Sequence, residues 1–451
     1  MHKIRIGSGA GYGGDRLEPA LELMEKGDLD YIIFECLAER TIAIAQEQRL
    51  KNPDKGYNGL LEYRMEKVLP LCVEKKIKVI TNMGAANPEA AAKAIKRMAQ
   101  DQGIKGLKIA AVLGDDISDK IDEYMDYNVL ELDKSLKHLE NKIISANAYV
   151  GTEGIIEALR NDADIIITGR VSDPALTLAP IMYEFGWNSE DYDLIGKGIM
   201  IGHLLECAGQ ITGGYYADPG YKDVPDAWNI GFPIAEISED GEVVIAKVDG
   251  SGGIITTGTC KEQLIYEIHD PSAYVTPDGI ADYTNVIMSQ IDKDKVLIKG
   301  ASGRAKPDTL KVSIGYKDCF IGEGEISYGG SGAYERAKLA GEIVKKRLEY
   351  TGVEIEELRI DYIGANSMYK DHISDNMLSD RSYCKEVRLR VSGRTKERKE
   401  AEKIANEVET LYTNGPAGGG GATKSVKEIV SIASIFIPRE DINIQAVYEE
   451  V

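Results

Sequence analysis

The chain has 451 residues, and at roughly 100–200 residues per domain this length predicts about two to four domains. Hydrophobic residues make up 43% and charged residues 28%, which excludes wholesale disorder and fibrous repeats. There are 54 lysines and arginines against 74 aspartates and glutamates, and the net charge of −20 repels nucleic-acid phosphates and anionic membranes. We therefore expect neither a nucleic acid nor a membrane as a partner.

The cysteines indicate a reducing compartment. No two of them lie within three residues of each other, so the C-x-x-C patterns of zinc and redox sites are absent from the sequence. Six are too few for a disulfide scaffold, and no apolar stretch resembles a signal peptide or a membrane span. We expect a soluble cytoplasmic protein.

Residues 1–206 alternate short apolar runs with helix-like stretches. Each run precedes a turn bearing Gly, Asn or Asp and then a helix, which is the βαβ pattern of a largely parallel sheet with flanking helices. The predicted strands are Lys3–Gly7, Tyr31–Phe34, Lys78–Ile80, Lys108–Leu113, Ala148–Val150 and Asp164–Thr168.

The second half of the chain has a different texture. Glycines and β-branched residues increase in 207–331, which predicts a β-rich α+β region with strands at Val243–Val248, Val296–Lys299 and Leu310–Tyr316. Residues 332–451 predict a smaller α/β unit with a last strand at Glu428–Ile437. The whole chain is thus predicted to be an α/β protein of three domains: 1–206, 207–331 and 332–451.

Four turns follow predicted strands: Gly7–Asp15, Glu35–Arg40, Thr81–Asn87 and Thr168–Pro174. Ligands of open α/β sheets bind at the carboxyl ends of the strands, so a parallel sheet would place all four turns on one rim. The candidate substrate-binding residues come from these turns and from the glycine-rich segment after Cys207. They are Gly9, Gly11, Tyr12, Gly13, Glu35, Asn82, Gly84, Asn87, Thr168, Ser172, Asp173 and Gly213.

The first turn, Gly9–Gly14, fits the pattern G-x-G-x-x-G, and Glu35 follows Gly14 by 21 residues. That resembles a dinucleotide fingerprint, in which an acid binds a ribose hydroxyl, and so one hypothesis is NAD(P) or flavin binding. Asp15 argues against it, because its charge would lie beside the pyrophosphate. Alternatively, the glycines allow a tight turn with Asp15 as a helix cap. Backbone contact with another ligand is the preferred interpretation, and the cofactor stays unknown; no P-loop occurs in the sequence.

Two further turns carry anion-binding chemistry. The amides and carboxamides of Asn82 and Asn87 at a helix start suit a carboxylate, a phosphate or a carbonyl oxygen, although helix capping by Asn87 explains the pattern equally well. Arg170 ends a strand, where an arginine binds carboxylate or phosphate in bidentate fashion. The alternative is an internal ion pair of Arg170 with Asp173 or Glu35.

His203, Glu206 and Cys207 form the densest group of reactive side chains. On a helix, His203 and Cys207 are four residues apart and share a face, with Glu206 beside them. The two could bind a metal with a third ligand, His203 could act as a general acid or base oriented by Glu206, or the group could be a buried structural one. We favour acid–base chemistry over a metal, and the structural interpretation stays open.

These motifs, read in order, resemble the acyclic terpene utilisation AtuA family. The segments that carry the resemblance are Arg5–Arg16, Thr81–Pro88, Ile167–Asp173, Gly202–Cys207, Thr212–Gly214, Asp270–Asp278, Gly300–Asp308 and Asn414–Gly420. The resemblance runs essentially end to end and implies a role near acyl-CoA or short branched carboxylic acid catabolism. Longer members of the family carry a further small C-terminal domain, so we expect it to be absent here or supplied by a separate small protein. We also expect a homo-oligomer.

Three hypotheses for function follow. The first is a lyase or hydratase acting next to a carboxylate or thioester carbonyl, with Arg170 and Asn82 holding the oxyanion or carboxylate and His203, Glu206 and the adjacent Cys207 forming the catalytic group. The second is an oxidoreductase that binds NAD(P) or flavin at the Gly9–Gly14 loop. The third is a non-catalytic subunit that binds an acyl-CoA.

Overall fold

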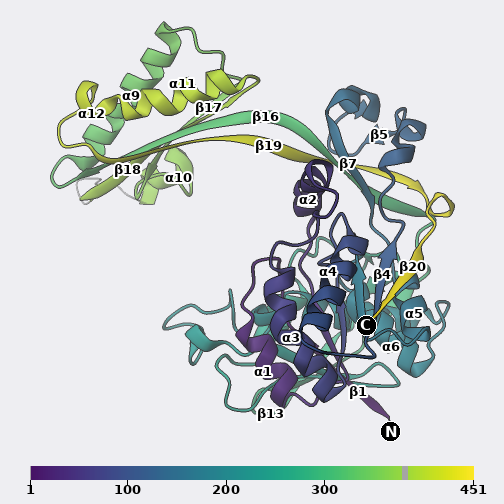
Figure 1. Cartoon of the computed structure of the whole chain (residues 1–451). Helices are drawn as coiled ribbons and strands as arrows, with labels where there is room; N and C mark the ends of the chain where they lie inside the picture. Colours follow the sequence, from purple (N-terminus) through teal and green to yellow (C-terminus); the bar gives the residue numbers. More distant parts are fainter. Residues whose placement is uncertain (1, 378–383) are drawn as a thin grey trace. The chain divides into compact units, whose positions relative to one another are not determined.

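The computed structural model describes residues 2–377 and 384–451. The chain divides into two compact units (Figure 1). The first unit comprises residues 1–315 and 432–451, and the second comprises residues 316–431. The predicted domain boundaries at residues 207 and 332 stay a prediction.

The first unit is built on a mixed sheet of ten strands. In order across the sheet they are β13 (Ile287–Asp292), β14 (Lys295–Lys299), β10 (Val243–Lys247), β9 (Pro233–Ser238), β1 (Lys3–Ser8), β2 (Tyr31–Phe34), β3 (Lys78–Thr81), β8 (Ile165–Thr168), β4 (Lys108–Leu113) and β20 (Gln445–Glu450). The strands from β1 to β4 in this order are parallel to one another, and the flanking strands pair antiparallel.

The parallel strands are apolar because helices cover both faces of the sheet. All four residues of β2 and of β8 are buried. The register pairs Ile6 with Tyr31 and Ile33 with Ile80, which aligns the carboxyl ends of neighbouring strands. The predicted α/β class and the predicted rim are therefore confirmed: the four turns follow β1, β2, β3 and β8, which are neighbours in the sheet.

Helices α1, α3 and α4 pack over one face of the sheet and share a hydrophobic core with it (Figure 1). Helices α6 and α7 contact β1 from the other face, and α5 contacts β4 and β20. The helices of this unit are α1 (Glu18–Lys26), α2 (Glu39–Lys51), α3 (Leu61–Lys75), α4 (Pro88–Asp101), α5 (Glu153–Arg160), α6 (Ala175–Phe185), α7 (Tyr192–Glu206) and α8 (Thr257–Leu264).

Short elements complete the first unit. The strands are β5 (Asn128–Val129), β6 (Lys134–Ser135), β7 (Ile143–Ala148), β11 (Tyr274–Val275), β12 (Ile280–Asp282) and β15 (Ser302–Arg304). The 3₁₀ helices are η1 (Ser118–Tyr124), η2 (Leu136–Lys142), η3 (Ala208–Gln210), η4 (Ala227–Asn229) and η6 (Arg439–Asp441). Strands β11, β12 and β15 form a small separate sheet.

The second unit has the split βαβ order, with strands arranged β17-β18-β16-β19 and the helices α9 and α11 packed against the same core. Its elements are β16 (Thr309–Gly329), α9 (Ala333–Tyr350), β17 (Glu357–Ile363), α10 (Lys370–Met377), β18 (Glu386–Thr395), α11 (Arg398–Glu409), α12 (Leu411–Asn414) and β19 (Gly420–Pro438). The chain enters this unit along β16 and leaves it along β19.

Two details of the predicted strands were wrong. The run Ala148–Val150 is not a strand of the parallel sheet, because β7 ends at Ala148 and pairs with β16. The predicted strands Leu310–Tyr316 and Glu428–Ile437 are strands in the structure, but their predicted bounds were too short, because they are parts of β16 and β19. Among the described residues, no helix is long and apolar enough to cross a membrane.

Helix α7 is held close to strand β15 by two glycines. A Cβ atom at Gly196 would collide with the carbonyl oxygen of Ser302, and one at Gly303 would collide with that of Tyr192. At the far end of the same helix, a Cβ at Gly202 would lie 2.5 Å from the carbonyl oxygen of Pro174. The close approach sets the position of the carboxyl end of α7, which carries His203.

We predict that Gly196→Ala lowers the free energy of unfolding by about 1–3 kcal/mol, because the added methyl group overpacks against backbone that cannot rotate away. This loss exceeds the gain of about 1 kcal/mol that alanine gives over glycine inside a helix. Urea unfolding followed by circular dichroism measures the change. Gly59→Ala is the control, because nothing lies within 4 Å of a Cβ there. An unchanged midpoint for Gly196→Ala would contradict the close packing.

Candidate active site

A cavity of about 720 Å³ lies at the rim of the first unit. Its lining includes the turns after β1, β2 and β8, the end of α7, and segments around β11 and the start of β16. Of the residues predicted for the site, those that line this cavity are Gly11, Tyr12, Glu35, Arg170, Asp173, His203, Glu206 and Cys207. The sequence patterns thus locate residues that the fold brings together around one space.

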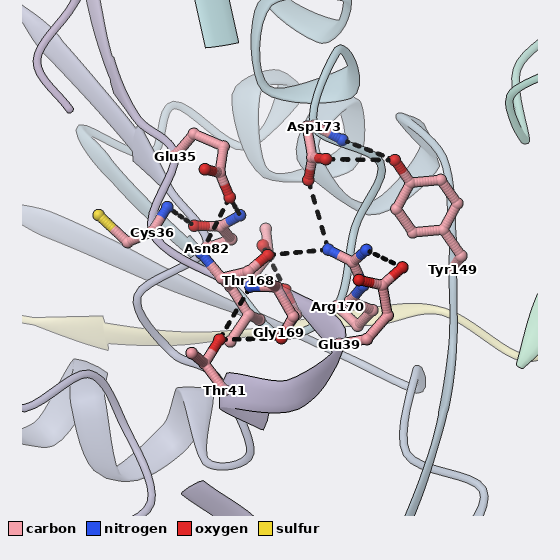
Figure 2. Close-up of polar contacts among 12 residues, drawn as sticks. Glu35, Cys36, Glu39, Thr41, Asn82, Tyr149, Thr168, Gly169, Arg170 and Asp173 are labelled. Carbon is pink, nitrogen blue, oxygen red and sulfur yellow. Dashed lines mark hydrogen bonds and ion pairs between the residues drawn. The ribbon is translucent and has the colours of Figure 1, made fainter. Parts of the chain in front are cut away.

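Arg170 is buried, with 4% of its side chain exposed. Its Nη1 donates hydrogen bonds to the carbonyl oxygen of Leu37 at 2.8 Å and to Asp173 at 3.3 Å, and its Nη2 lies 3.2 Å from Glu39 (Figure 2). The guanidinium carbon also lies 4.5 Å from the ring centre of Tyr149. Arg170 therefore joins the turns after β2 and β8 and neutralises the acids of both.

The backbone of Arg170 is fixed by a second buried acid. Asp115 accepts hydrogen bonds from the Arg170 amide at 2.9 Å and from the Asn147 side chain at 3.0 Å. Burial raises the pKa of Asp115 to about 6, against the opposing effect of these donors. A Cβ at Gly169 would lie 2.5 Å from the Asp115 carboxylate, so this position has room only for glycine.

Glu35 and Asn82 form a second polar group (Figure 2). Oε1 of Glu35 accepts hydrogen bonds from Asn82 Nδ2 at 3.0 Å and from the Leu37 amide at 2.9 Å. Oδ1 of Asn82 accepts the amide of Cys36 at 2.7 Å. Asn82 is fully buried and does not line the cavity, so it orients Glu35 and the turn after β2.

Two acids of the cavity, Glu35 and Asp173, have raised pKa values because they are buried and lie near other carboxylates. Burial raises the pKa of Glu35, and the nearby charge of Asp173 raises it further. Burial also raises the pKa of Asp173; Arg170 opposes this shift, and the charges of Glu206 and Glu39 add to it. Carboxyl groups with raised pKa values in a cleft are typical of general acids and bases.

His203 and Glu206 form a close pair at the end of α7. The distance between His203 Nδ1 and Glu206 Oε1 is 2.7 Å. Burial alone would lower the pKa of His203, but the charge of Glu206 and the hydrogen bond to it raise it overall. The His203 ring packs against Tyr274 and Tyr283, and its Nε2 and the Oε2 of Glu206 are buried without a hydrogen-bond partner. The predicted association of His203 with Glu206 is thus present in the structure.

Cys207 is the C-cap residue directly after helix α7, and it lines the cavity. Burial, followed by the charge of Glu206, raises the pKa of its thiol, so the thiolate needed by a nucleophile or a metal ligand is disfavoured. No group of three or more His, Cys, Asp or Glu residues among 2–377 and 384–451 is placed to hold a metal ion.

The glycines of the first turn face protein atoms. A Cβ at Gly9 would collide with Phe34, one at Gly11 would lie 2.5 Å from the backbone of Cys207, and one at Gly13 would lie 3.0 Å from the carbonyl oxygen of Cys36. The Gly11 amide donates to Asp15 at 2.9 Å. A Cβ at Gly14, the last glycine of the pattern, would lie 2.9 Å from the Tyr12 ring. Packing within the protein therefore explains this glycine pattern.

The other predicted residues lie outside the cavity lining. Asn87 caps α4 through the Ala90 amide and donates to two carbonyl oxygens of the 53–55 loop. Gly84 packs against Thr168, whose hydroxyl donates to the carbonyl of Gly169. The Ser172 hydroxyl is buried without a hydrogen-bond partner, and Gly213 has a positive φ of 111°.

Several lining residues were not predicted from the sequence. Among them are Glu39, Tyr149, Tyr266, Glu267, Tyr274 and Lys311. Glu39 lies in a turn that was predicted to be on the rim, and Tyr274 lies in a segment that carries the family resemblance, so both had a signal. Tyr149 and Lys311 come from distant parts of the chain and had none; Tyr149 reaches Asp173 with its hydroxyl at 3.5 Å.

The fold and the cavity define a mixed α/β protein with an acid-rich site at the carboxyl ends of its parallel strands. The family model described as acyclic terpene utilisation family protein AtuA matches residues 4–448, and the chain belongs to this family. Neither the curated proteins nor the solved structures include a match to this chain. The family description points to a catabolic role.

We predict that Glu35→Gln alters the pH dependence of stability. A carboxyl group with a raised pKa binds more protons in the native state, so its contribution to stability falls as pH rises from the unfolded value of about 4.3 through the native pKa. The glutamine retains the acceptor for Asn82 but does not titrate. The stability of Glu35→Gln relative to the unchanged protein should therefore increase with pH over this window, as measured by urea unfolding at a series of pH values.

Glu267→Gln provides the control, because it removes a carboxyl group from an exposed part of the same cavity. A difference between Glu35→Gln and the unchanged protein that decreases with rising pH would contradict the raised pKa.

Proposed function

We propose that this protein is an enzyme of acyl-CoA or short branched or hydroxy carboxylic acid catabolism, acting as a lyase of the hydratase type. The observation that carries the proposal is the meeting of two kinds of proton-handling group in one cavity: the Glu206–His203 pair and the carboxyl groups of Glu35 and Asp173 with raised pKa values. Removal of water next to a carbonyl needs a base for the carbon-bound proton and an acid for the departing hydroxyl.

Glu206 is the proposed base. One of its oxygens contacts His203, and the other is buried without a hydrogen-bond partner and so keeps an unused acceptor beside the cavity. His203 stabilises the carboxylate and fixes its orientation, as the second member of an acid–base pair does. His203 is therefore a positioning residue in this proposal.

Glu35 and Asp173 are the proposed proton donors. Because their pKa values are raised, the protonated forms persist toward neutral pH and can donate a hydrogen bond to a carbonyl oxygen or a proton to a hydroxyl. In dehydration, Glu206 takes the proton from the carbon next to the carbonyl, the carbon–oxygen bond breaks, and the departing hydroxyl takes the donor's proton to leave as water. Hydration is the reverse.

Arg170 has a positioning role in this proposal. Its guanidinium contacts Leu37, Asp173 and Glu39, so it favours the acids electrostatically and fixes the turns that carry them. We propose that it positions the acids, rather than binding the substrate carboxylate as the sequence suggested. Cys207, with its raised thiol pKa, serves as lining.

The remaining expectations belong to this proposal. The six cysteines are free, which supports a cytoplasmic location. A homo-oligomer, and a separate small protein as a partner, stay proposed. The oxidoreductase remains an alternative, but packing within the protein explains the glycine pattern that suggested it. The acyl-CoA-binding subunit also remains an alternative, but binding alone does not require the His203–Glu206 pair.

We predict that Glu206→Gln reduces catalysis about 10²- to 10⁴-fold, because it removes the group that takes the proton. The assay is deuterium incorporation from D₂O into 3-hydroxybutanoyl-CoA and but-2-enoyl-CoA, followed by mass spectrometry, together with the gain or loss of water. His203→Gln should lower the rate less and displace the pH profile, because the base remains but loses its partner.

His138→Gln is the control, because His138 is exposed and lies outside the cavity. Undiminished exchange in Glu206→Gln would exclude the proposed base. Exchange without water loss would favour another proton-transfer reaction over a hydratase.

A further inference from the structure

Acidic side chains outnumber basic ones in the lining of the cavity. Among the residues that the structure describes, five acids line it: Glu35, Glu39, Asp173, Glu206 and Glu267. The lining cations are Arg170 and Lys311, with His203 already paired to Glu206. A ligand that binds here therefore enters a predominantly acidic surrounding.

Arg170 is already in contact with protein groups and is barely accessible to a ligand. It contacts Asp173 at 3.3 Å and Glu39 at 3.2 Å, and its side chain is only 4% exposed. A substrate carboxylate placed beside Glu206 would be repelled by that carboxylate, and the guanidinium of Arg170 is too buried to compensate. Burial of an unpaired carboxylate is strongly unfavourable, whereas an uncharged carbonyl only needs a hydrogen-bond donor. The protonated forms of Glu35 and Asp173 supply such donors.

Lys311 is different from Arg170, because it lies at an exposed part of the lining. Its side chain is 40% exposed, and its ion pair is to Glu39 at 3.5 Å, an acid that it shares with Arg170. Lys311 is therefore the lining cation that an anionic part of a ligand can reach. Pro307, Thr309 and Phe436 lie in the same lining and offer mostly apolar contact.

From this distribution, and resting on the acid–base function proposed above, we infer that the substrate is divided into two parts. Its reacting end is an uncharged acyl group, in ester or thioester linkage, that lies among Glu35, Asp173 and Glu206. Its anionic part stays at Lys311. The site thus selects an acyl ester or thioester and rejects the corresponding free acid, and Lys311 is a specificity-determining residue.

The test compares four forms of one acyl group: 3-hydroxybutanoate, its methyl ester, its N-acetylcysteamine thioester and its CoA thioester. Binding is measured by isothermal titration calorimetry on the full chain and does not require turnover. We expect the free acid to bind at least about tenfold more weakly than either neutral form, because of the penalty for a buried unpaired charge. The CoA thioester should bind more tightly than the N-acetylcysteamine thioester, which has the same acyl group without phosphates.

Lys311→Met should weaken binding of the CoA thioester about threefold to fivefold, as expected for a partly exposed ion pair, and leave the neutral thioester unchanged. Lys311→Arg should retain the preference. Lys299→Met is the matched control: Lys299 is 48% exposed and also lies 3.5 Å from one acid, Glu242, but it lies outside the cavity lining.

Tighter binding of the free acid than of the neutral forms overturns the inference, as does an equal loss in Lys299→Met or no binding by any form. These outcomes are distinct from failure of the proposed function. If the thioesters bind as expected but no deuterium is exchanged, the division of the substrate stands and the hydratase chemistry does not.

Discussion

The site depends on one buried cation. Arg170 leaves the end of β8 with almost no exposed surface, and a guanidinium in that position is stable only when acids surround it. Asp173 and Glu39, from two different turns, form ion pairs with the Arg170 guanidinium. Asp115 accepts a hydrogen bond from the Arg170 backbone amide. The same acids then lie close to Glu35, and the crowding of carboxyl groups with limited water raises the pKa values of Glu35 and Asp173. A structural requirement of the sheet end therefore produces the acid–base character of the cavity.

The rim was predictable because it follows from local patterns and a general rule. Apolar runs such as Tyr31–Phe34 indicate buried strands, and helices between them require parallel pairing, so the turns that follow must share one edge. Arg170, Glu35 and Asn82 come from such turns and lie together as this rule requires. The helical spacing of His203 and Glu206 likewise predicted their pairing. The periodicity did not indicate that the carboxyl end of α7 lies at the carboxyl ends of the parallel strands.

Other parts of the site had no local signal. Lys311 reaches the cavity because β16 begins beside it, and Tyr149 because β7 pairs with β16 rather than with the parallel sheet. Such pairing joins residues that are far apart in sequence, and a three-residue apolar run such as Ala148–Val150 carries no information about its partner. The length of β16 was also not predicted: the predicted strand ended at Tyr316, whereas β16 continues to Gly329 through Gly322 and Gly324, which pack closely against Ala401 and Val408 of α11.

The glycine turn after β1 shows how a familiar pattern can arise from packing. At Gly11, the backbone of Cys207 occupies the space that a side chain would need, so the first turn and the end of α7 touch directly. That contact lies one residue from Glu206, and a bulkier residue at position 11 would push the end of α7 away from the rim. Gly11, the second glycine of the pattern G-x-G-x-x-G, thus lets the proposed base approach the carboxyl ends of the strands. A dinucleotide loop uses glycine because the cofactor approaches the backbone closely at the end of a strand. Here the backbone of Cys207 approaches Gly11 instead of a cofactor.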